Sequence, residues 1–99
     1  MAYTRIVVNV TVENRLALDP AARFRRVGDE GVVIQQLNAE VLVLNDTAAR
    51  LLELSDGKRT IADCADLIEA DFDADRDAMI HDLLQFAEEL VAAGVARVS

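Results

Sequence analysis

Closely spaced carboxylates are the first residues in this sequence that suggest chemistry. Four aspartates stand at every second position: Asp71, Asp73, Asp75 and Asp77. This spacing is typical of the oxygen ligands of a calcium-binding loop. That loop needs glycine at its sixth position and glutamate at its twelfth, where this chain has Arg76 and Asp82. Because carboxylates also stabilise the N-terminus of a helix, we interpret the aspartates as helix-capping residues and expect no metal site.

The single histidine and the single cysteine have no obvious catalytic partners. His81 falls on the outer side of a predicted helix, and a catalytic histidine needs a second group to orient it. Cys64 falls on the apolar side of another predicted helix, where an unpaired thiol is usually buried. Glycine loops for phosphate, paired CxxC motifs and a nucleophile elbow are missing from the sequence. We therefore expect no enzyme activity and no cofactor.

Charge is distributed unevenly along the 99 residues, whose net charge is −8. Residues 60–99 contain ten acidic residues and only Arg76 and Arg97 as basic ones, whereas residues 1–59 contain eight of each kind. Nucleic-acid binding depends on lysine and arginine side chains that displace counterions. The acidic half therefore argues against a nucleic-acid partner.

Neither a membrane span nor an export signal is expected. The sequence has no apolar run near the roughly 20 residues that cross a bilayer. The apolar stretch at residues 6–12 is interrupted by Asn9 and Thr11, and no cleavage site with small residues follows it. A lone cysteine cannot form an internal disulfide. Together these features predict a cytoplasmic protein without a membrane partner.

The N-terminal residues have the pattern of a β-strand. Residues 5–13 alternate between apolar and polar side chains and predict a half-buried strand. Residues 16–22, which include the only proline, Pro20, are expected to form a connection. A short strand is expected to follow at residues 24–27.

A hairpin is predicted in the middle of the chain. Residues 28–31 are rich in turn-forming types, and residues 32–36 and 41–44 are rich in β-branched and aliphatic side chains. Asn38, between the last two runs, suits the positive φ of a tight turn. With the strand at residues 24–27, the hairpin gives a three-stranded antiparallel sheet.

After residue 44 the apolar period changes to about 3.6, which predicts helices. Asn45 or Asp46 is expected to cap the first helix, and Asp56-Gly57 to end it. Thr60 and Asp63 have the spacing of a capping box for a second helix. The side chains expected to face inward are Ala48, Leu51, Leu52, Ile61, Cys64, Ala65 and Ile68.

A third helix is expected to begin at Asp73 or Asp75 and to stop at Gly94. Its predicted core face comprises Ile80, Leu83, Leu84, Ala87, Leu90 and Val91. Met79 and Phe86 lie on a shoulder beside this face. The shoulder either meets the sheet or lines a groove.

Two stretches of the sequence resemble the PqqD family. Residues 43–54 read VLNDTAARLLEL, and residues 56–61 read DGKRTI. In that family a strand ends in Leu-Asn, a helix reads Thr-Ala-x-x-(Ile/Leu)-Leu, and Asp-Gly-x-Arg-(Thr/Ser) opens the next helix. The similarity extends over about residues 16–98. It implies an α+β, small winged-helix-like peptide-binding domain at residues 16–99, with a three-stranded antiparallel sheet, three helices and an additional N-terminal strand at residues 1–15.

The resemblance also implies a function. Members of this family act as recognition elements that bind the leader segment of ribosomally made, post-translationally modified precursor peptides. The leader is expected to add as an extra strand to the hairpin's second strand, beside the third helix, and to be delivered to a modifying enzyme such as a radical SAM enzyme. The residues expected to bind the peptide are Val41, Leu42, Val43, Leu44, Met79, Asp82, Leu83 and Phe86.

Elementary physics agrees with this expectation and leaves two alternatives. An edge strand offers unpaired N–H and C=O groups to any extended peptide, so the chain could equally be a general protein-interaction or dimerisation module. A winged-helix DNA-binding protein shares the expected outline, but its third helix should be basic. The third helix here begins among aspartates.

The predicted N-terminal strand is too apolar to remain in water. It could pair with the chain's own sheet, exchange with a second copy to form a homodimer, or occupy the leader edge itself. We favour the first two arrangements, because the shoulder of Met79 and Phe86 suits a separate ligand.

Overall fold

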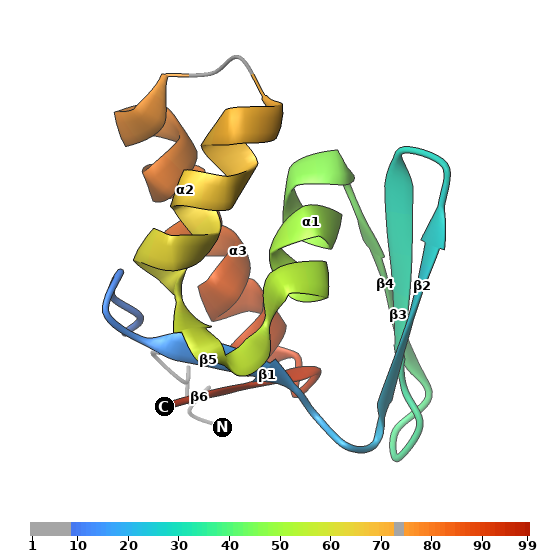
Figure 1. The fold of residues 1–99 in the computed structure, drawn as a ribbon. Coiled ribbons are helices and arrows are strands. Elements are labelled where there is room, and N and C mark those ends of the chain that lie inside the picture. Colours follow the sequence, from blue (N-terminus) through green and yellow to red (C-terminus); the bar gives the residue numbers. More distant parts are fainter. Residues whose placement is uncertain (1–8, 73–74) are drawn as a thin grey trace, which may run out of the picture.

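The computed structural model describes residues 9–72 and 75–99. Within these residues the chain forms six strands and three helices (Figure 1). They are β1 (Arg15–Leu18), β2 (Ala22–Val27), β3 (Glu30–Gln35), β4 (Glu40–Leu44), α1 (Asp46–Leu54), β5 (Asp56–Thr60), α2 (Ile61–Asp71), α3 (Arg76–Ala92) and β6 (Ala96–Val98). The predicted α+β fold class, with its three-stranded antiparallel sheet and three helices, is confirmed.

The described strands form two antiparallel sheets. The predicted sheet has the order β2-β3-β4, and a second, unpredicted sheet has the order β5-β1-β6. The expectation of a simple connection at residues 16–22 is therefore wrong at both ends, because residues 16–18 lie in β1 and Ala22 begins β2. Figure 1 shows the three helices beside the β2-β3-β4 sheet, with the second sheet beneath them.

The predicted N-terminal strand is absent from the part of residues 5–13 that the structure describes. Residues 5–8 lie outside the described residues, and residues 9–14 form turns and irregular backbone instead of a strand. Val10 is nevertheless buried in the core, as its apolar character requires. The carbonyls of Val12 and Asn14 accept hydrogen bonds from the N–H groups of Ala62 and Ile61, so this segment is held against the start of α2.

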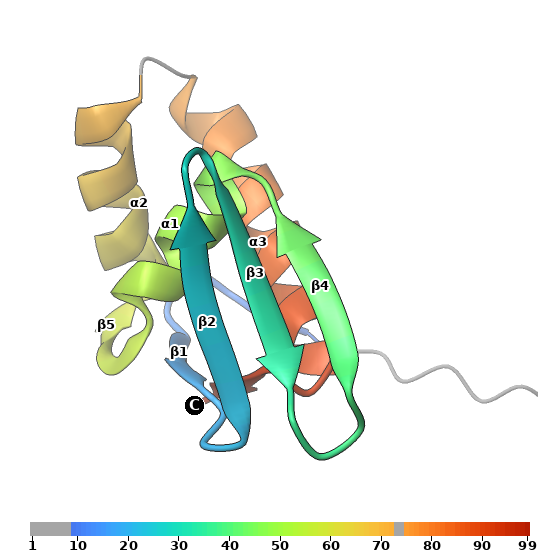
Figure 2. The same cartoon turned by 90° about the vertical axis from the view of Figure 1, so that its right-hand side faces the viewer.

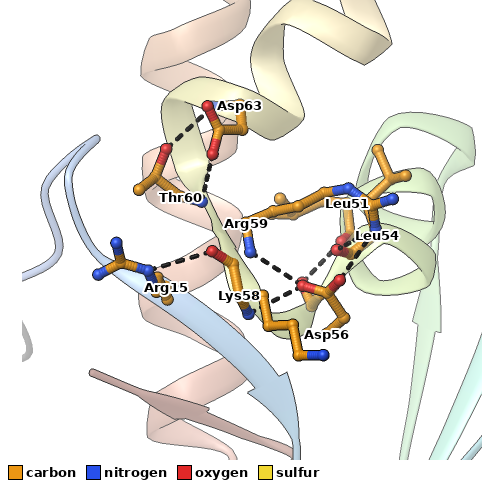
Figure 3. A network of polar contacts seen from close by, with 9 residues as sticks. Arg15, Leu51, Leu54, Asp56, Lys58, Arg59, Thr60 and Asp63 are labelled. Atoms are coloured by element: carbon orange, nitrogen blue, oxygen red, sulfur yellow. Dashed lines mark hydrogen bonds and ion pairs between the residues drawn. The ribbon is translucent and has the colours of Figure 1, made fainter.

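The helix starts follow the predicted capping chemistry. Asn45 caps α1, Thr60 and Asp63 form the capping box of α2, and Asp75 caps α3. Figure 3 shows both hydrogen bonds of the capping box. The alternative start at Asp73 lies outside the described residues. The helix ends also agree closely, since α1 ends before Asp56 and Gly94 follows α3.

The buried side chains form two clusters on either side of α1. The first cluster joins α2 to the N-terminal half of α3, and the second joins α1 to the β2-β3-β4 sheet and the C-terminal end of α3. All the inward residues predicted for the first two helices are buried. No helix within residues 9–72 and 75–99 is long and apolar enough to cross a membrane.

The buried stripe of α3 is rotated relative to the prediction. It comprises Met79, Leu83, Ala87 and Leu90, and three of the residues expected in the core, Ile80, Leu84 and Val91, are only partly buried. Met79 is 5% exposed and belongs to the interior, so its assignment to a shoulder is wrong. The cause is that α3 packs against both α2 and α1, whose combined surface selects the helix face at Met79.

Gly31 allows the sheet to approach α1 closely. A Cβ atom at this position would lie 2.6 Å from a ring carbon of Phe24 and 2.9 Å from the Cβ of Ala49. Both distances are shorter than van der Waals contact, so a side chain here would push β3 away from α1. Glycine at this position therefore sets the spacing between the sheet and the helix.

Replacing Gly31 with alanine should lower the free energy of unfolding by about 1–3 kcal/mol, the usual cost of overpacking a core. Urea denaturation followed by circular dichroism measures this change. The control is Val32→Ala on the opposite face of the same strand, which should cost less. Equal losses for the two variants would show that the close contact does not limit the packing.

Candidate functional site

The β2-β3-β4 sheet has two lateral edges, β2 and β4 (Figure 2). An unpaired strand edge presents a row of N–H and C=O groups that can accept another strand. Which of these groups are free depends on how the strands pair. The hydrogen-bonding pattern of the sheet therefore decides where a ligand strand can bind.

The pairing of β2 with β3 sets this pattern. In an antiparallel ladder, opposed residues alternate between pairs that exchange N–H···O bonds and pairs that do not. The N–H of Gln36 donates to the carbonyl of Ala21 at 2.9 Å, one position beyond the last pair of the β2–β3 ladder. Counting from Gln36, every second residue of β3 directs its backbone groups to β2. The residues between them, including Val33, direct theirs to β4.

The same alternation identifies the free groups of β4. Val33 opposes Leu42, so the backbone groups of Leu42 point into the sheet. Val41 and Val43 must then point their N–H and C=O groups away from the sheet. The ladder with β3 does not use these groups, and outside the ladder no described residue hydrogen-bonds to them. The edge of β4 thus offers two donors and two acceptors at every-second-residue spacing.

The opposite edge, β2, is partly covered by the chain itself. At Ala22, whose backbone groups face this edge, the N–H donates to the carbonyl of Asp19 and the carbonyl accepts a hydrogen bond from Nη1 of Arg23, both at 2.9 Å. Side-chain coverage of this kind protects an edge against strand addition. Phe24 and Arg26 also direct backbone groups to this edge, but β2 carries the exposed, charged side chains of Arg23 and Arg25, and charge on an edge strand disfavours strand addition. The β4 edge, where Val41 and Val43 are exposed and apolar, is therefore better suited to accept a strand.

The side chains of β4 divide between its two faces. Val41 is 55% exposed and Val43 is 67% exposed, on the face away from the helices. Leu42 and Leu44 point to the other face and pack against the cluster that contains Leu90 of α3. A strand added to β4 would therefore meet apolar side chains on both of its faces.

The third helix contributes fewer residues beside β4 than the sequence predicts. Phe86 is half-buried and packs against both core clusters, including the cluster that β4 contacts. Met79 and Leu83 lie instead in the cluster shared with α2, and Leu83 is fully buried. Of the α3 residues predicted for the site, Phe86 shares a cluster with Leu42 of β4, and Asp82 is exposed one turn before Phe86.

A second exposed acidic residue stands near Phe86 on α3 and is not among the residues predicted for the site. Glu89 is exposed and stands three positions after Phe86, on the same side of the helix. The helical spacing from Phe86 was the available signal. Asp82 and Glu89 thus stand about one turn before and one turn after Phe86, so exposed negative charge on this side of α3 would favour positively charged ligand groups.

A polar network around the buried side chain of Gln35 links the sheet to the end of α3. The side-chain Nε2 of Gln35 donates to the carbonyl of Gly94 at 2.7 Å and to Oδ1 of Asp19 at 3.4 Å. The other oxygen of Asp19 accepts a hydrogen bond from Nε of Arg97 in β6 at 2.9 Å. These bonds connect β3 to the glycine that follows α3 and, through Asp19, to β6 of the other sheet.

The turn between β3 and β4 differs in one detail from the prediction. The residue with positive φ is Ala39, at 56°, and not Asn38. The side chain of Asn38 instead accepts a hydrogen bond from the N–H of Glu40 at 3.0 Å. Asn38 thus stabilises the turn through its side chain and leaves the left-handed conformation to its neighbour.

The motif residues of the DGKR stretch have a structural role. Oδ1 of Asp56 accepts hydrogen bonds from the N–H groups of Lys58 and Arg59, both at 2.9 Å (Figure 3). These backbone donors, with the nearby Arg59 side chain, lower the pKa of Asp56. The carbonyl of Lys58 accepts a hydrogen bond from Arg15 of β1. The motif therefore shapes the turn from α1 to α2 and lies away from the β4 edge.

The groups that could do covalent or metal chemistry are not assembled into a site within the described residues. Residues 9–72 and 75–99 contain no group of three or more His, Cys, Asp and Glu side chains placed to hold a metal ion. Cys64 is buried, and this burial raises the pKa of its thiol, so the thiolate nucleophile is disfavoured. His81 is exposed on α3.

Comparisons with known proteins identify a family and a fold. The family model described as "Coenzyme PQQ synthesis protein D (PqqD)" matches residues 30–96. The structure of "TbiB1 in Complex with the TbiA(beta) Leader Peptide" is similar, with a TM-score of 0.73 and 20% sequence identity, over 82% of this chain and 94% of that chain. No curated protein sequence matches the chain.

Acid should weaken the network around Asp19. The N–H of Ala21 and then the side chain of Arg97 lower the pKa of Asp19 below its ordinary value. Because the pKa of Asp19 is lower in the folded protein than in the unfolded chain, its ionised form stabilises the fold at pH values above about 3.9, the ordinary carboxyl pKa. This contribution is lost as the pH falls through the pKa of Asp19 in the folded protein. Urea unfolding between about pH 7 and about pH 3 measures this loss.

Asp19→Asn should reduce the stability at neutral pH and flatten its fall toward acid pH. The control Asp29→Asn removes an exposed carboxylate at the tip of the β2–β3 turn, which makes no ion pair with a described residue. If both variants keep the wild-type dependence on pH, the network around Asp19 does not couple stability to protonation.

Proposed function

The chain belongs to the PqqD family, and from this premise we propose that it binds the leader segment of a ribosomally made precursor peptide as an added strand on β4. In this role the chain has no catalytic step of its own. It holds the leader and presents the precursor to a peptide-modifying enzyme, such as a radical SAM enzyme.

The observation that carries the proposal is the pair of outward-facing residues on β4. Within the described residues, Val41 and Val43 leave four backbone groups unpaired and carry exposed apolar side chains. On the opposite edge, Ala22 is covered by Asp19 and Arg23, and the exposed charge of Arg25 disfavours an added strand. Each backbone hydrogen bond gives a net stabilisation of about 0.5–1.5 kcal/mol. Such bonds supply affinity without demanding a particular sequence, so selectivity must come from the neighbouring side chains.

The similarity to TbiB1 supports a leader-binding role. That structure is of a complex with a leader peptide, and its fold corresponds to most of this chain. The strand, the helix and the hairpin that form the candidate site here all lie within the residues that match the family model.

The side chains beside β4 indicate what kind of leader would fit. Successive side chains of an added strand point to opposite faces. On one face they would meet Val41 and Val43, and on the other they would lie beside Leu42 and Phe86. Asp82 borders this second face, so apolar residues at alternating positions followed by a basic residue match the site best.

Val43→Pro should abolish most of the affinity for the leader. It removes the outward N–H of Val43, which makes no bond within the sheet, so the fold should be retained; proline is tolerated where a strand's N–H faces solvent. Calorimetric titration with the leader peptide of the precursor should give at least a tenfold weaker complex, or about 1.4 kcal/mol.

Val43→Ala is the matched control, because it shortens the same side chain and keeps the N–H. Its affinity should stay much closer to that of the unmodified protein. Equal affinities for the proline variant and the unmodified chain, with both folded, would exclude strand addition at β4.

Asp82→Asn should weaken binding of a basic leader about two- to fivefold at low salt, the range of an exposed ion pair. The effect should fade as salt screens the charge. His81→Lys makes the same change in charge on a different side of α3 and serves as the control. Identical affinities for both variants at low salt would remove Asp82 from the site.

A further inference from the structure

The free edge of β4 is also complementary to a second copy of itself. We propose that two copies of this chain associate by antiparallel pairing of their β4 strands about a twofold axis that passes beside Leu42. The contact uses the same backbone groups as the peptide site, but it needs no peptide to form. The association itself does not depend on the proposed function. Only the inference that the dimer competes with the leader for the β4 edge rests on that function.

One register of the pair satisfies all four free groups of each copy. With Leu42 opposite Leu42 of the second copy, Val41 lies opposite Val43 of the second copy, and the reverse holds on the other side of the axis. These are the residues whose N–H and C=O groups point outward. Each of the two Val41–Val43 pairs can then exchange two N–H···O bonds, as in any hydrogen-bonded antiparallel pair.

The neighbouring registers are less favourable, because they would pair β4 residues with residues outside the strand. Pairing Val41 with Val41 of the second copy would place Val43 opposite Ala39, whose φ of 56° is outside the strand conformation. Pairing Val43 with Val43 of the second copy would place Val41 opposite Asn45, which caps α1. The register centred on Leu42 keeps every paired residue within the five residues of β4.

The side chains agree with this register. Val41 and Val43 are both exposed on the outer face, and each would gain an aliphatic cross-strand neighbour from the second copy. Ile34, exposed on the adjacent strand, lies opposite Val41 within the chain and extends this apolar surface. Pairing therefore joins two small exposed apolar patches into one that is partly covered.

Charge does not oppose the contact at close range. Glu40 is the only ionisable residue of β4. In the register centred on Leu42 it lies opposite Leu44 of the second copy, so the two Glu40 residues are four positions apart along the strands. This separation is about 13 Å at 3.3–3.4 Å per residue, which exceeds the Debye length of about 8 Å at physiological salt.

The complex should nevertheless be weak. An interface of five residues from each copy falls well below the roughly 20–30 residues on each side of a standard protein interface. Each copy also has a net charge of −8, and salt should strengthen the association by screening this repulsion. A basic leader should show the opposite dependence on salt. A weak dimer would leave the edge covered in concentrated protein and open to a peptide that binds more tightly.

Sedimentation of the full chain alone, from about 10 μM to about 1 mM, tests the association directly because weak interfaces of this kind dissociate in that range. The unmodified protein should shift from monomer to dimer as the concentration rises, and at a lower concentration in higher salt. Val43→Pro should remain monomeric. A monomer throughout, or a Val43→Pro variant that dimerises equally well, would overturn the proposal.

Cysteine cross-linking tests the register. In an oxidised equimolar mixture of Val41→Cys and Val43→Cys chains, the mixed disulfide should exceed the 50% expected for random pairing. The two cysteines would be opposed with Cα atoms about 5.5 Å apart, within the range of a disulfide. Predominant homodisulfides of either variant would contradict the register. Cys64 is buried and should not interfere. Neither experiment contains a peptide, so failure here leaves the leader-binding proposal intact.

Discussion

The candidate site depends on one constraint: the hydrogen-bonding pattern of the β2-β3-β4 sheet, which decides which backbone groups pair inside the sheet and which face its edges. Val27 opposes Glu30 across a two-residue connection, and Gly28 has the positive φ of 60° that such a tight hairpin turn requires at its first position. This turn makes Val27 and Glu30 a hydrogen-bonded pair, so the pairs that follow along β2 and β3 alternate in a fixed order between non-hydrogen-bonded and hydrogen-bonded. The pairing continues from β3 into β4, so a turn at Gly28 determines that Val41 and Val43 face the open edge.

A second constraint decides which face of the sheet is buried. Gly31 lets β3 approach Ala49 of α1, and Arg26 of β2 forms ion pairs with Asp46 and Glu53 of the same helix. Because side chains alternate along a strand, burial of Gly31 and Val33 places Leu42 and Leu44 on the helix side and the two valines outside. The backbone edge and the apolar surfaces beside it are thus produced by the same packing.

Much of this arrangement could be predicted from local signals in the sequence. The hairpin residues, the caps at Asn45 and Thr60, and the inward residues of α1 and α2 follow from patterns within a few positions. The strands β1, β5 and β6 could not be found in this way, because they are short and pair with partners far away in the chain; Leu16 opposes Val98, for example. Residues 56–60 also have the composition of a turn.

The candidate site could be predicted only in part, for a related reason. Alternation along residues 41–44 predicts which side chains share a face, but it does not say which backbone groups point to β3 and which to the open edge. The position of Met79 was also beyond local reasoning, because several faces of α3 are apolar and its contacts with α2 and α1 select among them. The coverage of Ala22 by Arg23 likewise depends on how the β2 edge is completed in three dimensions.

Hydrogen exchange of individual backbone amides tests the central claim most directly, because it detects new bonds at the groups assigned to the edge. The amides of Val41 and Val43 should exchange rapidly in dilute protein and become protected when the leader peptide is added. The amides of Phe24 and Arg26, which face the β2 edge, should not change. Protection that arises at the β2 edge, or bound peptide that leaves Val41 and Val43 unprotected, would contradict the assignment of β4 as the binding edge.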